Sequence, residues 1–153
     1  MIDPFTAAHV VGGGYRLYKW LQQCVECGLT VHNKDRKALY FAVCWVHDKG
    51  SESWGWYKVP KYESRTIGVP VPRIGSSTFY LYAQNNKGER WPGTKNFYVA
   101  NPQGKLVDGQ SFTVVDAATN SPELVRNQGV GRLSVVSGTA KVITGDDSFV
   151  FAG

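Results

Sequence analysis

Tryptophan and tyrosine side chains have the strongest potential for ligand recognition in this sequence. The stretch SESWGWYKVP, residues 51–60, carries Trp54, Trp56 and Tyr57 within four positions. In an extended strand, side chains two positions apart share a face and lie about 7 Å apart. We therefore expect Trp54 and Trp56 on one face and Tyr57 on the other, with Gly55 leaving room for a close approach from behind.

These rings have two interpretations, and the sequence leaves both open. Indole rings are mostly buried on average and contribute large areas to protein cores. A flat pair of exposed rings would instead form a platform on which a sugar ring or a nucleobase stacks. The choice decides whether the chain is only a small β-fold or a β-fold with a binding face.

A second aromatic group follows in the stretch STFYLYAQ, residues 77–84. Phe79 and Leu81 alternate with Tyr80 and Tyr82, which predicts an inward aliphatic face and a tyrosine face that could be exposed. Trp91 lies close in sequence, and basic side chains that could supply polar contacts accompany it. The predicted ligand-binding set is Trp54, Trp56, Tyr80, Tyr82, Arg90, Trp91 and Lys95.

The three cysteines do not form a metal site by their spacing. Cys24 and Cys27 make one C-x-x-C pair and Cys44 stands alone, whereas a typical zinc site needs a second pair. The pair also lies outside the strand-to-helix context of a redox motif. One disulfide from Cys44 to either other cysteine is expected in an exported protein, and free buried thiols are the alternative.

The histidines His9, His32 and His47 have no metal-like spacing either. His47 precedes Asp48 in a turn, but a catalytic dyad would also need a nucleophile. The sequence contains no nucleophile elbow, phosphate loop or paired-carboxylate motif. We therefore predict no enzymatic activity, with no catalytic residue, no metal and no cofactor.

Composition sets the class of protein. The chain has 153 residues, which is about one domain, and its net charge of +5 favours an anionic partner such as nucleic acid or an anionic envelope polymer. The basic residues are scattered rather than grouped in a run. No apolar stretch reaches the roughly 18 residues of a membrane span, and no signal peptide is visible. Residues 1–6, MIDPFT, are typical of a cloning-vector remnant, so a native signal could have been removed.

The order of elements predicts an all-β fold. Residues 7–14 end in three glycines and should form a flexible segment. Residues 15–28 have apolar positions at helical spacing and predict one short helix, although a strand also fits them. The run ALYFAVCWV, residues 38–46, predicts a central strand buried on both faces. Pro70 and Pro72 place their segment at a sheet edge or a strand end, because proline cannot donate ladder hydrogen bonds.

Strand candidates recur about every ten residues through the rest of the chain. The stretch NKDRK, residues 33–37, predicts a hairpin-like turn. We expect eight to ten short strands in an antiparallel β-sandwich or barrel. Residues 15–153 are assigned to a single β-domain.

Several of these stretches resemble a bacterial family of small proteins of unknown function. The resemblance rests on GWYKVPKYESRTI (residues 55–67) and TFYLYAQNNKGERWPGTKNFYV (residues 78–99), which are similar to the family's Gly-Trp-Trp strand, Tyr-rich strand and Trp-x-Gly. With LTVHNKDRKALYFAVCW (residues 29–45) and SFTVVD (residues 111–116), it covers residues 29–116. The family is commonly exported, so the resemblance implies a periplasmic or secreted β-fold, and it implies no known activity.

The sequence also departs from that family. Tyr57 stands where the family has a second tryptophan. His32, Ser64 and Tyr98 occupy positions where the family often has cysteine, so the family's disulfides would be missing. The oxidising compartment that the resemblance implies therefore has no support from these positions, and a cytoplasmic location stays open.

These observations favour a non-enzymatic binding domain for a carbohydrate or another ring-bearing envelope component. Ring stacking would supply the affinity, with polar contacts from Arg90 and Lys95. The alternatives are a protein-interaction module that assembles as a homo-oligomer and a binder of single-stranded nucleic acid, which would weaken steeply with salt.

Overall fold

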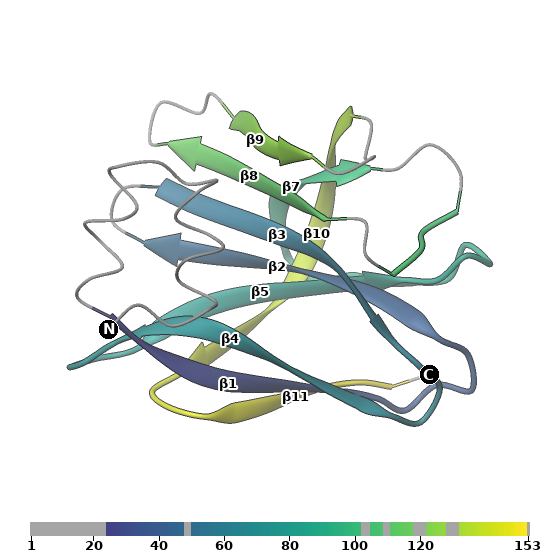
Figure 1. Ribbon diagram of the computed structural model, residues 1–153, viewed down its shortest axis with the longest axis horizontal. Helices are drawn as coiled ribbons and strands as arrows, with labels where there is room; N and C mark the ends of the chain where they lie inside the picture. The colour runs from purple at the N-terminus through teal and green to yellow at the C-terminus, as the bar shows by residue number, and fades with distance from the viewer. Residues whose placement is uncertain are drawn as a thin grey trace.

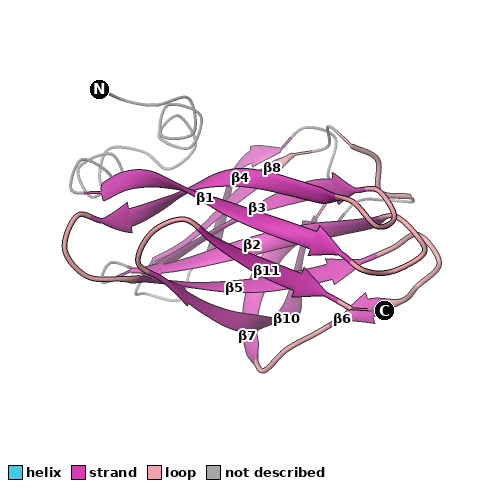
Figure 2. Ribbon diagram, turned by 90° about the horizontal axis from the view of Figure 1, so that it is seen from below, coloured by secondary structure: helices cyan, strands magenta, loops and turns pink. Residues whose placement is uncertain are grey.

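Strands make up all the regular structure in the described part of the chain. The computed structural model describes residues 24–47, 50–101, 105–108, 111–117, 122–127 and 132–152, with the backbone path alone for 117 and 122–127. Figure 2 shows strands joined by loops and no helix in this part. The predicted all-β class is confirmed. The strands are β1 (Cys24–Asn33), β2 (Leu39–His47), β3 (Gly50–Val59), β4 (Ser64–Pro72), β5 (Ser77–Gln84), β6 (Arg90–Trp91), β7 (Lys95–Asn101), β8 (Phe112–Ala117), β9 (Pro122–Asn127), β10 (Arg132–Ile143) and β11 (Asp147–Phe151).

The strands form two sheets that face each other (Figure 1). The smaller sheet has the order β11-β1-β4, and β1 pairs in parallel with β11 and antiparallel with β4. The larger sheet has the order β7-β10-β5-β2-β3-β8-β9, and β6 pairs with the end of β5. β10 pairs with β7 along residues 132–138 and with β5 along residues 139–143. This long strand therefore connects two parts of the larger sheet.

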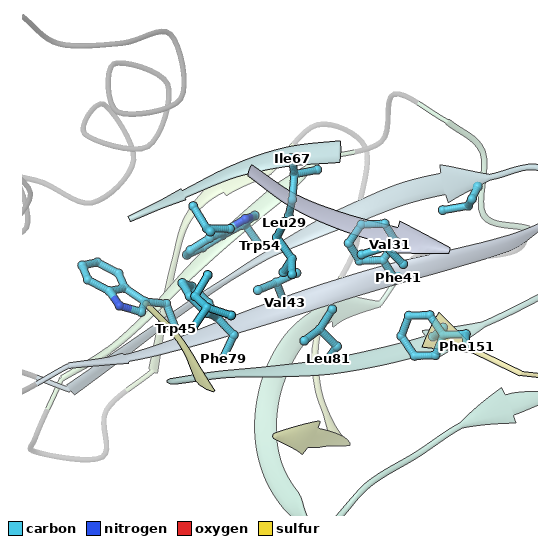
Figure 3. Packing of buried hydrophobic residues seen from close by; sticks show 14 of the residues in the cluster. Leu29, Val31, Phe41, Val43, Trp45, Trp54, Ile67, Phe79, Leu81 and Phe151 are labelled. Atoms are coloured by element: carbon cyan, nitrogen blue, oxygen red, sulfur yellow. The ribbon is translucent and has the colours of Figure 1, made fainter. Parts of the chain in front are cut away.

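The first hydrophobic core fills the space between the two sheets. Figure 3 shows Leu29 and Val31 of β1 pointing toward Phe41 and Val43 of β2, with Leu81 of β5 beside them. All five side chains are fully buried. The outer face of the smaller sheet carries polar side chains such as Thr30, His32 and Ser64 beside the exposed Val150, and β1 alternates between core and surface over residues 27–33, as expected for a sheet covered on one side.

A second core lies on the opposite face of the larger sheet. The sheet curls until β7 packs over β3 and β8. Two side chains of β3 fix this approach by donating to the backbone of β7: Ser53 Oγ bonds the carbonyl of Tyr98, and Trp56 Nε1 bonds the carbonyl of Ala100 at 3.0 Å. Phe97, Val99, Leu106, Phe112 and Val114 belong to this core, so the larger sheet approaches a closed barrel.

Two features of the strands confirm the sequence analysis. β2 lies centrally between β5 and β3, and its residues 39–45 are buried on both faces, as the apolar run predicted. β4, which contains Pro70 and Pro72, is an edge strand of the smaller sheet. Proline costs no ladder hydrogen bond on the free side of an edge strand.

Two local predictions fail within the described residues. The helix predicted for residues 15–28 lies partly outside the described residues, and its last five residues, from Cys24 to Gly28, form the start of β1. Their backbones pair with β4 between Pro72 and Gly68, and this long-range pairing overrides the helical spacing. Residues 33–37 do not close a hairpin, because β1 and β2 belong to different sheets.

Candidate anion-binding pocket

The two tryptophans of β3 do not form a platform. Trp54 and Trp56 are each 2% exposed and belong to different cores. The register between β2 and β3 shifts so that Phe41 lies opposite Tyr57 and Ala42 lies opposite Gly55. Trp56 is the extra residue of this β-bulge, and a bulge reverses the alternation of faces. The prediction that Trp54 and Trp56 share a face opposite Tyr57 is therefore wrong.

The tyrosine face of β5 is covered rather than exposed. Phe79 and Leu81 lie in the first core as predicted, but Tyr82 is 2% exposed and Tyr80 is half-buried in the second core. The Trp56 ring packs at 6.1 Å from the Tyr82 ring in an edge-on arrangement. Burial raises the pKa of Tyr82, and its hydroxyl donates to Gln84 Oε1 at 2.8 Å. The predicted exposed strip fails because β7 closes over this face.

The remaining predicted residues lie apart from one another. Trp91 is half-buried against the first core, 6.4 Å from the Phe151 ring, and its Nε1 donates to the carbonyl of Ala152 at 2.7 Å. Arg90 is exposed beside it, opposite Gln84. Lys95 is exposed at the start of β7, opposite Gly138. The predicted set is therefore divided between the two cores and separate parts of the surface.

A different group of residues surrounds a pocket of about 200 Å³ at the end where β2 begins and β3 and β5 end. Three segments distant in sequence contribute to it: the loop before β2 with the start of that strand, the end of β3, and the turn between β5 and β6. The lining residues are Lys37, Ala38, Tyr40, Lys58, Asn85, Asn86 and Lys87. Three lysines and no carboxylate line this pocket.

Strand pairing sets the floor of the pocket. Tyr40 of β2 lies opposite Lys58 of β3 on one side and Gln84 of β5 on the other. Tyr40 is 7% exposed and belongs to the second core. The pocket therefore lies where this core reaches the surface, at one end of the curled sheet. Its aromatic floor and basic rim combine an apolar surface with positive charge.

Asn33 fixes the loop that carries Lys37. Its buried side-chain amide donates to the carbonyls of Lys37, Val59 and Pro60 at 2.9, 3.0 and 3.1 Å. Its Oδ1 accepts from the backbone nitrogen of Asp35 at 2.8 Å. One side chain therefore ties this loop to the end of β3. A buried amide with all these partners satisfied fixes the position of the loop relative to the strand.

Two asparagines fix the opposite rim. Asn85 Oδ1 accepts from the backbone nitrogens of Lys87 and Glu89 at 2.9 and 3.1 Å. Asn86 exchanges two hydrogen bonds with the backbone of Leu106, donating to its carbonyl at 2.9 Å and accepting from its nitrogen at 2.8 Å. These amides are already bonded within the protein, so the pocket's remaining side-chain nitrogen donors are its lysine ammonium groups, of which that of Lys37 also contacts Glu89.

Sequence reasoning missed this pocket because its charges are far apart in the chain. Lys37 follows Arg36, but Lys58 and Lys87 have no basic neighbour, and the three lysines form no common basic run. The one available signal was that Lys37 and Lys87 both occur in turn-like segments, but the sequence does not show that these turns meet. Only the antiparallel pairing of β2 with β3 and β5 brings them together.

The three cysteines are free thiols, and they are divided between the two cores. Cys24 and Cys27 pack at the first core, whereas Cys44 belongs to the second. Burial raises the pKa of Cys24 to about 11 and that of Cys44 to about 12, which keeps both thiols protonated. The disulfide expected between Cys44 and one of the others is not formed, because the Cys44 side chain lies on the opposite face of the larger sheet from Cys24 and Cys27.

Comparison with known proteins gives no relative: no family model, no curated protein and no solved structure matches the chain. Within the described ranges, no three His, Cys, Asp or Glu side chains gather in a way that could hold a metal ion. The same part of the chain contains no helix suited to span a membrane.

Proposed function

We propose that this protein is a non-enzymatic binding domain that accepts an acidic group of a carbohydrate polymer in the lysine pocket. The observation that carries the proposal is the convergence of Lys37, Lys58 and Lys87 on a pocket with no lining carboxylate. Ammonium groups bind carboxylate, sulfate or phosphate oxygens through charge-assisted hydrogen bonds. The chain's net charge of +5 also attracts an anionic polymer from a distance.

The size of the pocket supports recognition of one group rather than of a whole ligand. Its volume of about 200 Å³ is below the roughly 300–1,000 Å³ of sites that enclose a drug-sized molecule. A single acidic sugar of a longer chain would place its charge among the lysines and its ring against Tyr40. The lining contains no carboxylate, imidazole or thiol, so among the usual acid–base and nucleophilic groups it offers only lysine and tyrosine.

We further propose that the protein is related to the exported bacterial family that its sequence resembles and acts at the cell envelope. His32 and Ser64, where that family often has cysteines, lie directly opposite each other on β1 and β4. Their side chains touch, with His32 Nδ1 and Ser64 Oγ 2.5 Å apart. Adjacent positions of this kind suit a cross-strand disulfide, which supports the proposed relationship.

The test is a titration with acidic polysaccharides, neutral polysaccharides and single-stranded DNA at two salt concentrations. We expect affinity only for acidic chains, and a loss of about tenfold or more in Lys58→Gln, since one charge-assisted bond contributes about 1.5–3 kcal/mol. Lys141→Gln is the matched control, because Lys141 is a lysine outside the pocket that pairs with Asp147 at 3.3 Å. Equal binding of neutral chains, or equal losses in both variants, would contradict the proposal. Equally strong binding of DNA would instead indicate a general polyanion site.

A further inference from the structure

One carboxylate stands beside the lysine pocket without lining it. Glu89 Oε1 lies 3.0 Å from Lys37 Nζ and accepts a hydrogen bond of 2.7 Å from Asn85 Nδ2. Lys37 and Asn85 both line the pocket. A single oxygen of Glu89 is therefore shared between the pocket's cation and one of its fixed amides.

The two contacts of Glu89 differ in how firmly they hold. The ion pair with Lys37 is exposed, with 41% of the Lys37 side chain and 52% of the Glu89 side chain accessible to solvent. Such exposed pairs contribute little and exchange readily. The contact with Asn85 is reinforced, because the backbones of Asn85 and Glu89 are also bonded, with nitrogen to carbonyl at 3.1 Å. Lys37 can therefore leave while Glu89 stays.

The charge state of Glu89 fits this arrangement. The hydrogen bonds from Asn85 and Lys37 lower the pKa of its carboxyl group, so Glu89 is ionised at neutral pH. A ligand anion must then share Lys37 with a carboxylate that is already in place. It also meets the repulsion of that carboxylate across a few ångströms of solvent.

We propose that Glu89 is a resident counter-ion that sets the affinity and selectivity of the pocket. An incoming anion takes Lys37 from the Glu89 carboxylate, which Asn85 keeps beside the site. Ligand groups of higher charge density, such as phosphate or sulfate esters, displace it better than a carboxylate does. This inference rests on the proposed function, because it assigns a regulator to the same pocket.

The test compares Glu89→Gln with the unmodified protein, using inorganic phosphate and acetate as probes. Glutamine keeps an oxygen that can accept from Asn85 but removes the charge. We expect phosphate affinity to rise about fivefold at low salt, as removal of one like charge near 4 Å in water predicts. The gain should shrink as salt is added, because screening weakens the repulsion. The gain should be larger for phosphate than for acetate, because phosphate carries more negative charge and is repelled more strongly by Glu89.

Two controls keep the inference distinct from the function on which it rests. Asp147→Asn removes the same charge and breaks a comparable exposed pair with Lys141, away from the pocket, so it should change affinity much less. In a Lys37→Gln background, Glu89→Gln should lose most of its effect. Equal gains in Glu89→Gln and Asp147→Asn would overturn the counter-ion role of Glu89 alone. So would the absence of any gain in Glu89→Gln while Lys58→Gln still weakens binding about tenfold. No phosphate binding in any variant would overturn both proposals.

Discussion

Trp54 and Trp56 lie on opposite faces of the larger sheet, although a single glycine separates them. The bulge at Trp56 is the cause, because it places Gly55 opposite Ala42 and Tyr57 opposite Phe41. Trp54 can then fill the core between the sheets while Trp56 fills the core under β7. This short segment of β3 therefore contributes one indole to each of the two cores.

Trp56 and Trp91 each donate to a backbone carbonyl, and these two indoles should differ in their contribution to stability. Trp56→Phe leaves the Ala100 carbonyl without its buried donor, and we expect this to lower the free energy of unfolding by about 1–3 kcal/mol beyond the packing loss. Trp91→Phe removes a bond to Ala152 near solvent, where water can replace it. Urea unfolding of both variants measures the difference, and equal losses would contradict the burial of the Trp56 bond.

Glu52 should make the protein less stable as pH rises. Its side chain is 1% exposed, and burial raises the pKa of its carboxyl group well above 4.5. The folded state therefore favours the protonated form. Stability is greatest below the unfolded pKa and falls above it, by up to about 1.4 kcal/mol per pH unit until the folded pKa is reached. Glu52→Gln should raise the melting temperature at pH 7 and have little effect near pH 4.

Asp147→Asn provides the comparison of opposite sign for that experiment. A backbone hydrogen bond from Ser148 and the ion pair with Lys141 lower the pKa of Asp147, so its contribution is present above the unfolded pKa and is lost as the pH falls. Melting curves between pH 3 and pH 8 should show the two variants diverging in opposite directions. A Glu52→Gln curve parallel to that of the unmodified protein would show that Glu52 does not titrate with folding.

A disulfide engineered at His32 and Ser64 should form and stabilise the fold. The two residues are directly opposite on antiparallel strands, where Cα atoms lie about 4.5–5.5 Å apart, within the range that a disulfide spans. They are 32 positions apart in sequence, so the cross-link should contribute about 3.7 kcal/mol by restricting the unfolded chain. Melting of the double cysteine variant with and without reductant measures this gain. Persistent free thiols under oxidising conditions would contradict the register of β1 and β4.

Gly93 should tolerate no side chain. A Cβ atom at this position would lie 2.1 Å from the backbone of Gly138, where the segment before β7 crosses β10. The backbone nitrogen of Gly93 also donates to the carbonyl of Ser137 at 3.0 Å, which prevents the segment from moving away. We expect Gly93→Ala to lower the free energy of unfolding by about 3 kcal/mol, the upper end of the usual effect of overpacking, because the neighbouring atoms belong to the backbone. Gly145→Ala has no atom within 4 Å of its Cβ and is the control, with little expected change.

The sequence alone determined the class of fold and the character of single strands. Alternation in residues 77–84 placed Phe79 and Leu81 in a core, and the apolar run at residues 38–46 identified the central strand. Pro70 and Pro72 identified an edge strand. These inferences succeeded because they depend on local periodicity and on the hydrogen bonds that each residue can make.

Only the tertiary structure decided which faces are exposed and which charges meet. A strand's sequence specifies two faces but not what covers them. The sequence therefore could not show that β7 packs over the tyrosine face of β5. The bulge at Trp56 depends on the register with β2, and the lysine pocket depends on three segments that only strand pairing brings together. The burial of a side chain and its distance from other charges depend on contacts with residues far away in the sequence. A local sequence pattern carries no information about those contacts.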